Sequence, residues 1–259
     1  EEYKSDPQIL TRLINRVLTT LTNRIIERRG TIDKYMGDCV MAFWNAPLSD
    51  TEHAIHACEA ALDMLTALEA LNEERRAEAG EDAAAVKPLK VGVGINTGDC
   101  VVGNMGSEQR YGYTVLGDAV NLASRLESQS RTYGVDVVIG ESTATAVQAR
   151  FALLELDLIA VKGKSEAVRV FTIVGDMAML SRTAYQRWQA AHDALLVAYR
   201  ARQWDTAEAR LVECQSLAAE AVGDRAPSGL YMLYADRIQE FRHSPPTQDW
   251  DGVYRVATK

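Results

Sequence analysis

The sequence predicts an α+β domain with an antiparallel sheet, followed by a small all-α extension. As far as about Gly175, short apolar stretches typical of strands outnumber helical patterns. Few neighbouring strands in this region are separated by a full crossover helix, which a connection between parallel strands requires. After Gly175, apolar residues recur at helical spacing as far as about Arg242. We therefore expect one domain over residues 1–175 and a helical extension over residues 176–259.

The N-terminal part of the chain predicts a helix and then a hairpin. Pro7 suits the first turn of a helix, and apolar residues recur at helical spacing until Gly30, which ends it. Residues 31–44 hold short apolar stretches on both sides of Gly37-Asp38, a pattern typical of strand, tight turn and strand. The turn places Asp38 at the tip of the predicted hairpin.

The middle of the domain continues with a second helix and further strands. Ser49 and Glu52 form the pattern of a capping box before a second helical stripe. Residues 90–94 and 100–103 are expected as two strands joined by a turn. Residues 103–112 follow as a polar, glycine-rich stretch.

The remaining sequence predicts the other strands of the sheet and the helices of the extension. Gly117-Asp118 introduces a helix that runs to about Ser128. Further strands are expected at residues 113–116, 135–139, 153–158 and 168–174. In the extension, the spacing of Trp188, Tyr199 and Trp204 resembles a tetratricopeptide unit. Fewer than three such repeats are present, so we expect these helices to pack against the first domain.

Composition places the chain among ordinary globular proteins and excludes several classes. Of 259 residues, 47% are hydrophobic and 25% are charged, which excludes a disordered or fibrous chain. The net charge of −8 makes nucleic acid and anionic membrane surfaces poor partners. The four scattered cysteines are typical of a reducing compartment. With no apolar run that spans a bilayer and no signal peptide, we expect a cytoplasmic location without direct membrane contact.

Three segments hold residues suited to chemistry on a phosphorylated ligand. Asp38 at a hairpin tip is placed to hold a hard cation. Asn121 and Arg125 lie four apart, so on a helix they share a face and suit a sugar and a phosphoryl group. Lys162 lies in a glycine loop, where an ammonium suits phosphate. Each has a plainer interpretation: a solvated turn, an arginine paired with a nearby acid, and an ordinary loop lysine.

Taken together, these segments resemble one family, the class III nucleotidyl cyclases, which are adenylyl and guanylyl cyclases. The resemblance rests on GTIDKYMGD at residues 30–38, GINTG at 94–98 and VNLASRLE at 120–127, in that order, and covers roughly residues 1–175. It implies a palm-like (ferredoxin-like) antiparallel sheet with flanking helices. It also implies a homodimer with each active site between the subunits. The helical tail resembles the extension of bacterial cyclases.

The resemblance implies an adenylyl cyclase that converts ATP to cyclic AMP and pyrophosphate. Two Mg²⁺ or Mn²⁺ ions per site would assist attack of the ribose 3′-hydroxyl on the α-phosphorus. Asp38 matches one of the two aspartates that hold these metals. Lys34 matches the lysine that contacts adenine, where guanylyl cyclases usually carry Glu. Thr114 occupies the second position that contacts the base, where many adenylyl cyclases carry Asp.

The resemblance also implies roles for three residues around the ribose and phosphates. Asn121 should orient the ribose. Arg125 should stabilise the charge that develops on the reacting phosphorus. Lys162 should hold the terminal phosphates. The implied partners are ATP, a second copy of the chain, and an upstream sensor domain in a longer, membrane-anchored protein whose cytosolic part this chain would be.

One departure from the family pattern leaves two alternatives open. The family's other metal-binding aspartate lies on a strand just before the first helix, and this chain begins at Glu1, after that point. We expect an upstream segment to supply it. The missing aspartate motivates a non-catalytic nucleotide-sensing or dimerisation module. Thr114 in place of Asp motivates a guanylyl cyclase. Lys34 argues against the latter, because its ammonium cannot accept the N–H donors of guanine.

Overall fold

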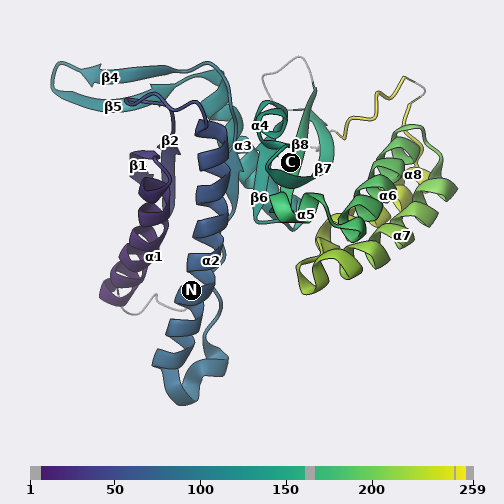
Figure 1. Cartoon of the computed structure of the whole chain (residues 1–259), viewed down its shortest axis with the longest axis horizontal. Helices are drawn as coiled ribbons and strands as arrows, with labels where there is room; N and C mark the ends of the chain where they lie inside the picture. The colour runs from purple at the N-terminus through teal and green to yellow at the C-terminus, as the bar shows by residue number, and fades with distance from the viewer. Residues whose placement is uncertain (1–6, 161–166, 248, 255–259) are drawn as a thin grey trace. The chain divides into compact units, whose positions relative to one another are not determined.

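The chain divides into two compact units, each described here by itself. The structure is a computed structural model that describes residues 7–160, 167–247 and 249–254. The first unit covers Glu1–Val91 and Asp99–Val120, and the second covers Gly92–Gly98 and Asn121–Lys259. Figure 1 shows the elements of both units, coloured along the chain. None of the helices within the described residues is long and apolar enough to cross a membrane.

The first unit contains two long helices and two antiparallel ribbons. The β1–β2 ribbon follows α1, and the β4–β5 ribbon follows later in the chain. The unit's elements are α1 (Pro7–Glu27), β1 (Thr31–Met36), β2 (Cys39–Phe43), α2 (His53–Ala79), the 3₁₀ helix η1 (Gly80–Ala85), β4 (Val101–Ser107) and β5 (Arg110–Leu116).

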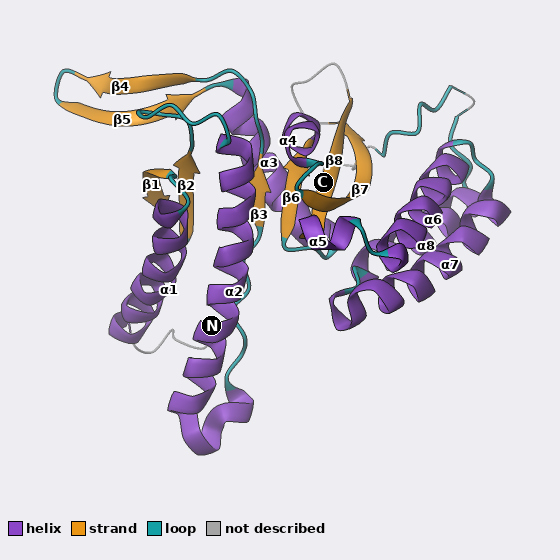
Figure 2. Cartoon of the chain, viewed as in Figure 1, coloured by secondary structure: helices purple, strands orange, loops and turns teal. Residues whose placement is uncertain are grey.

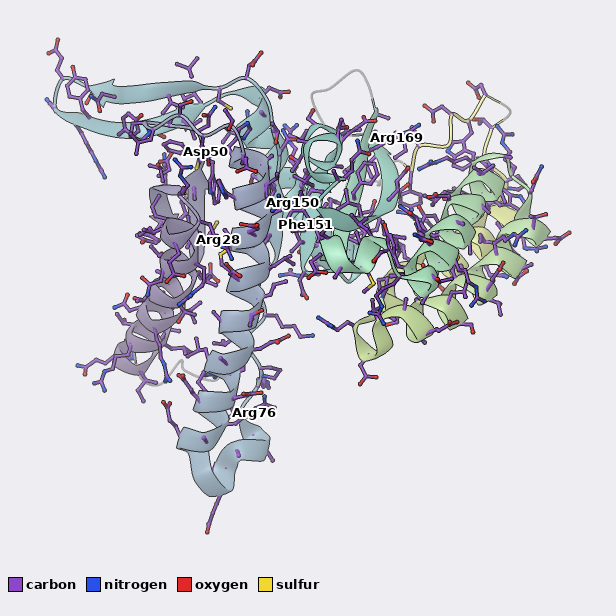
Figure 3. The ribbon with its side chains drawn as sticks, in the orientation of Figure 1. Arg28, Asp50, Arg76, Arg150, Phe151 and Arg169 are labelled. Atoms are coloured by element: carbon purple, nitrogen blue, oxygen red, sulfur yellow. The ribbon has the colours of Figure 1, made fainter. Side chains whose placement is uncertain are left out.

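Helices α1 and α2 pack through an apolar face and an ion-pair cluster. Leu21 and Ile25 are the buried residues of α1. Arg28, just after α1, donates from Nη1 to Glu59 at 2.7 Å and from Nε to Asp63 at 2.6 Å, both on α2 (Figure 3). Such partly exposed pairs contribute modestly to stability, so the apolar contact provides most of the packing energy.

The start of α2 differs from the expected capping box. The Ser49–Glu52 prediction is wrong, because α2 begins at His53 and its N-cap, Glu52, makes no side-chain cap hydrogen bond. Asp50 accepts the backbone N–H of Glu52 at 3.1 Å and lies 2.7 Å from Nδ1 of His56. The carboxylate of Asp50, nearly fully buried, thus accepts the Glu52 N–H that the expected serine would have met.

The second unit is built on a four-stranded sheet with helices around it (Figure 2). The strand order is β3-β6-β8-β7, in which β3 and β6 are parallel and the other neighbours are antiparallel. Its elements are β3 (Val93–Ile95), most of α3 (Asp118–Tyr133), β6 (Val137–Gly140), α4 (Glu141–Val147), β7 (Phe151–Ala160), β8 (Ala167–Asp176), α5 (Met177–Leu180), α6 (Thr183–Arg200), α7 (Trp204–Val222), η2 (Gly223–Arg225) and α8 (Ser228–His243).

The C-terminal helices share one hydrophobic core with α3 and β7. Buried Trp188 and Tyr199 of α6 belong to the same cluster as Leu126 of α3 and Leu156 of β7. Several polar groups inside this core are paired, which offsets the cost of their burial. The hydroxyl of Tyr185 donates to the carbonyl of Leu153 at 2.8 Å and accepts its N–H at 3.0 Å.

A buried ion pair joins α8 to the sheet. Arg237 Nη1 lies 2.6 Å from Oδ2 of Asp157 on β7, and both side chains are almost completely buried. The same carboxylate oxygen accepts the hydroxyl of Tyr133 on α3 at 3.0 Å. Removing one partner of such a pair costs about 3–5 kcal/mol, because the other charge stays buried. This ion pair therefore holds α8 of the extension against the sheet.

The α+β fold class is confirmed, and a second local prediction is wrong. The expected hairpin of residues 90–94 and 100–103 does not form. Instead, β3 pairs with β6, and β4 pairs with β5 along the stretch described from the sequence as polar and glycine-rich. Glycine and asparagine are depleted in strands, which hides this part of the ribbon from sequence patterns. The sheet is therefore mixed rather than wholly antiparallel.

Candidate active site

Lys34 and Thr114, far apart in the sequence, meet in the first unit. Nζ of Lys34 on β1 donates to Oγ1 of Thr114 on β5 at 3.3 Å. A third residue, Asp33, completes the group: Oγ1 of Thr114 donates to its Oδ2 at 2.6 Å. The backbone N–H of Val115 donates to the same oxygen at 3.2 Å, and Lys34 Nζ lies 3.2 Å from Oδ1. We call Asp33, Lys34 and Thr114 the Lys–Thr–Asp cluster.

An irregularity in β1 explains how two adjacent residues reach one hydroxyl. Neighbouring side chains of a regular strand point to opposite faces. Here the register shifts: Ile32 pairs with Ala42, but Lys34 pairs with Met41, which leaves Asp33 as the extra residue of a bulge. Bulges re-aim side chains and are common next to active sites. The bulge lets Asp33 and Lys34 both contact Thr114.

The electrostatics of the cluster favour an ionised Asp33 beneath an exposed lysine. The Asp33 side chain is 1% exposed, whereas that of Lys34 is 48% exposed. Burial alone would raise the pKa of Asp33, but the hydrogen bonds from Thr114 and Val115 and the nearby ammonium of Lys34 lower it below its usual value. The cluster thus presents a cation and a hydroxyl at the surface, held by a buried anion.

Asp38 lies, as expected, in the turn between β1 and β2. Gly37 has a φ of 66°, which glycine adopts without strain, and the turn leaves Asp38 exposed. Within the described ranges, no group of three or more His, Cys, Asp or Glu side chains is placed to hold a metal ion. The described residues therefore do not by themselves form the expected two-metal site. Asp38 supplies one carboxylate, and the pair of ions stays a prediction.

Asn121 and Arg125 lie on α3, beside the buried face of this helix. Leu122 and Leu126 are among the buried residues of this helix, while Asn121 is exposed and Arg125 half-buried. Four residues apart, Asn121 and Arg125 share a face. Gly94 of β3 allows α3 to lie directly against the sheet, because a Cβ there would overlap the backbone of the helix. Lys162, the sixth expected residue, lies outside the described residues.

Asp33 is the residue of this group that sequence patterns do not reveal. The sequence shows an aspartate beside Lys34 in a predicted strand, where aspartate is disfavoured. That mismatch is a usable signal, because a carboxylate in a strand interior needs partners. Its partner, Thr114, is 81 residues away, so only the fold identifies it.

Comparison with known families and curated proteins gives a consistent result. Residues 2–175 match the family model of the adenylate and guanylate cyclase catalytic domain. Adenylate cyclase 1 of Rhizobium meliloti (strain 1021) is 33% identical over 177 residues, covering 68% of this chain and 26% of the relative. The adenylate cyclase of Anabaena cylindrica is 36% identical over 171 residues, covering 65% of this chain and 33% of the relative. The chain thus spans about a quarter to a third of these relatives.

Solved structures of similar fold include cyclases of both base specificities. The adenylyl cyclase CyaB from P. aeruginosa matches with a TM-score of 0.59 and 32% identity, covering 70% of this chain and 88% of that one. The guanylyl cyclase Cya2 matches with a TM-score of 0.57 and 29% identity, covering 68% of this chain and 85% of that one. The choice of nucleotide must therefore be argued from side chains.

Proposed function

Because the chain belongs to the adenylate and guanylate cyclase catalytic domain family, we propose that it is the catalytic part of an adenylyl cyclase. Its reaction would convert ATP to cyclic AMP and pyrophosphate. The ribose 3′-hydroxyl would lose its proton and attack the α-phosphorus, forming the new ester bond. The bond between the α-phosphorus and the oxygen that bridges it to the β-phosphorus would break, and pyrophosphate would leave.

The observation that carries this proposal is the contact between Lys34 and Thr114. An ammonium has only donors, and adenine offers an unprotonated ring nitrogen, N1, where guanine carries N–H. Lys34 therefore favours adenine over guanine at a site that contacts the base edge. The adenylate cyclases of Rhizobium meliloti and Anabaena cylindrica, each more than 30% identical, support the same substrate.

The remaining site residues act on the ribose and phosphates in this proposal. The amide of Asn121 would hydrogen-bond the ribose, and the guanidinium of Arg125 would stabilise charge on the α-phosphoryl group. Lys162 would hold the terminal phosphates. Asp38 would bind one divalent ion, Mg²⁺ or Mn²⁺, whose charge would neutralise part of the triphosphate when bound.

Dimerisation and the domain boundary belong to the same proposal. We propose that two copies of the chain share each active site, with residues 1–175 as the catalytic domain and 176–259 as the helical extension. The family match to residues 2–175 supports this boundary. The common core of α6–α8 with α3 and β7 supports a stabilising role for the extension.

Product analysis tests the proposal directly. The full-length protein is incubated with ATP or GTP and Mg²⁺ or Mn²⁺, and cyclic nucleotides are quantified. We expect cyclic AMP from the wild type and its loss in Lys34→Ala and Asp38→Ala. Arg210→Ala, on the exposed face of α7, serves as the matched control and should retain activity.

Two results would favour other functions. The guanylyl alternative is favoured by Thr114 and by the likeness to Cya2, and it requires cyclic GMP as the main product. A folded protein that binds ATP and forms neither cyclic nucleotide would instead be a nucleotide-sensing or dimerisation module.

A further inference from the structure

The bulge residue Asp33 lies beneath both groups that are proposed to contact the base. We propose that Asp33 is a positioning residue that selects adenine by making the Thr114 hydroxyl a hydrogen-bond acceptor. This inference rests on the proposed function, since it concerns the base contacts of that same site. It assigns a role to a residue that acts through the Thr114 hydroxyl.

The first step is the chemistry of the buried carboxylate. Asp33 is 1% exposed and receives three polar groups: the Thr114 hydroxyl, the Val115 N–H and the Lys34 ammonium. These groups hold the pKa of Asp33 below its usual value although burial opposes this. An ionised carboxylate carries no proton and can only accept hydrogen bonds.

The second step is the direction of the Thr114 hydroxyl. A threonine hydroxyl has one hydrogen and two lone pairs. At 2.6 Å from Oδ2 of Asp33, Oγ1 must donate its hydrogen to the carboxylate. Its remaining capacity is to accept, and it already accepts from Lys34 Nζ at 3.3 Å. Toward any ligand, Thr114 is therefore an acceptor.

The third step is the match with the purine edge. Adenine presents an amino donor at position 6, whereas guanine presents a carbonyl acceptor there. A hydroxyl restricted to accepting suits the adenine amino group and leaves the guanine carbonyl facing another acceptor. With Asp33 beneath it, the Thr114 hydroxyl thus only accepts hydrogen bonds from a ligand, as a carboxylate does, but it brings no exposed charge.

The Asp33→Asn variant tests this role. Its amide oxygen must still accept the Val115 N–H, but a neutral amide accepts the Thr114 hydrogen more weakly than a carboxylate does, so that hydrogen can turn toward a guanine carbonyl. We expect the ratio of kcat/KM for ATP to kcat/KM for GTP to fall by about 3- to 10-fold, the worth of one neutral hydrogen bond. The change should appear mainly in KM, since Asp33 does not touch the reacting phosphorus.

Thr114 variants show whether Asp33 acts through the hydroxyl. Thr114→Val removes the hydroxyl with little change of shape and should lower the ATP to GTP ratio, whereas Thr114→Ser should keep it. Adding Asp33→Asn to Thr114→Val should change the ratio no further. Thermal unfolding of each variant reports whether it folds.

Distinct outcomes separate the two proposals. Failure of the wild type to cyclise either nucleotide contradicts the proposed function. Cyclisation of ATP with an unchanged ratio in Thr114→Val, or in folded Asp33→Asn, overturns the role of Asp33 alone. An equal fall in the ATP to GTP ratio when Asp33→Asn is added to the wild type and to Thr114→Val would also overturn it. Asp33 would then not act through the Thr114 hydroxyl.

Discussion

Arg125 is the residue on which the proposed chemistry depends most. It lies on α3 with Asn121, and it is less buried than Leu122 and Leu126 of the same helix. In the proposed reaction its charge would act where negative charge develops at the α-phosphoryl group, so its contribution would belong to the transition state rather than to ATP binding.

Replacing Arg125 should therefore lower kcat much more than it changes KM. We expect Arg125→Ala to reduce kcat for ATP by about 10²- to 10³-fold, as removal of one donor to a developing charge does in other enzymes. Steady-state kinetics measure the split. Arg131→Ala, an exposed arginine in the last turn of the same helix, is the control and should keep kcat. A large rise in KM with kcat unchanged would place Arg125 in ground-state binding instead.

Among single residues, the placement of some could be predicted from the sequence and that of others could not. The place of Asp38 follows from Gly37, because a tight turn at a glycine is a local property. The approach of Lys34 to Thr114 is implied by family resemblance and appears in the structure as a hydrogen bond. Asp33 could not be assigned, because its role depends on a one-residue register shift that no local pattern encodes.

Among the elements, the contact between α6 and β7 has a consequence for stability. His192 of α6 is completely buried, and its Nε2 lies 2.6 Å from the carbonyl oxygen of Glu155, which can only accept. Its Nδ1 lies 3.3 Å from the hydroxyl of Tyr231, which itself accepts from Trp188 Nε1 at 2.6 Å. Nε2 therefore carries the hydrogen, and Nδ1 can accept the hydroxyl hydrogen of Tyr231, an arrangement that suits neutral histidine.

The burial of neutral His192 predicts acid sensitivity of folding. Burial lowers its pKa from 6.5 to about 4, so the unfolded chain binds the proton first as pH falls. This stabilising contribution is complete above pH 6.5 and is lost progressively between pH 6.5 and about 4. From pH 7.5 to 5 the loss should be about 2 kcal/mol.

A non-titrating side chain isolates this effect. Denaturant unfolding of wild type and His192→Gln at both pH values should give a clearly smaller pH dependence for the variant. Glutamine can still donate to the Glu155 carbonyl, so the variant remains a fair comparison. Equal pH dependence of the two proteins would show that His192 does not control acid stability.

Helices and strands with a local sequence pattern were predicted correctly. Elements that depend on the pairing of strands were not. The helix from Pro7, the hairpin after it and the long strands β7 and β8 follow from periodicity and turns. The ends of the β4–β5 ribbon, at 100–103 and 113–116, were predicted as strands. Its remaining part, at 103–112, and the pairing of the two strands were missed, because glycine and asparagine there are weak strand formers. The short helix α4, Glu141–Val147, has too few turns to produce a periodic signal.

For the whole molecule, the proposed homodimer predicts complementation between inactive variants. If each site takes Asp38 from one subunit and Asn121 from the other, mixed dimers of Asp38→Ala and Asn121→Ala hold one intact site. Random pairing of equal amounts should restore about a quarter of wild-type cyclic AMP formation. The test mixes the purified variants under conditions of subunit exchange. Light scattering confirms the dimeric state, and fluorescence energy transfer between differently labelled copies confirms the exchange. Dimers that exchange without regaining activity would contradict a shared site.

The central claim is that Lys34 and Thr114, supported by Asp33, make this cyclase domain select ATP. The most direct measurement is a competition assay, in which the full-length protein receives equal ATP and GTP with Mg²⁺ or Mn²⁺ and both cyclic products are quantified. We predict cyclic AMP in excess by about tenfold or more, as expected when the hydrogen-bonding polarity of the site opposes guanine. Equal amounts of the two products, or an excess of cyclic GMP, would contradict the claim.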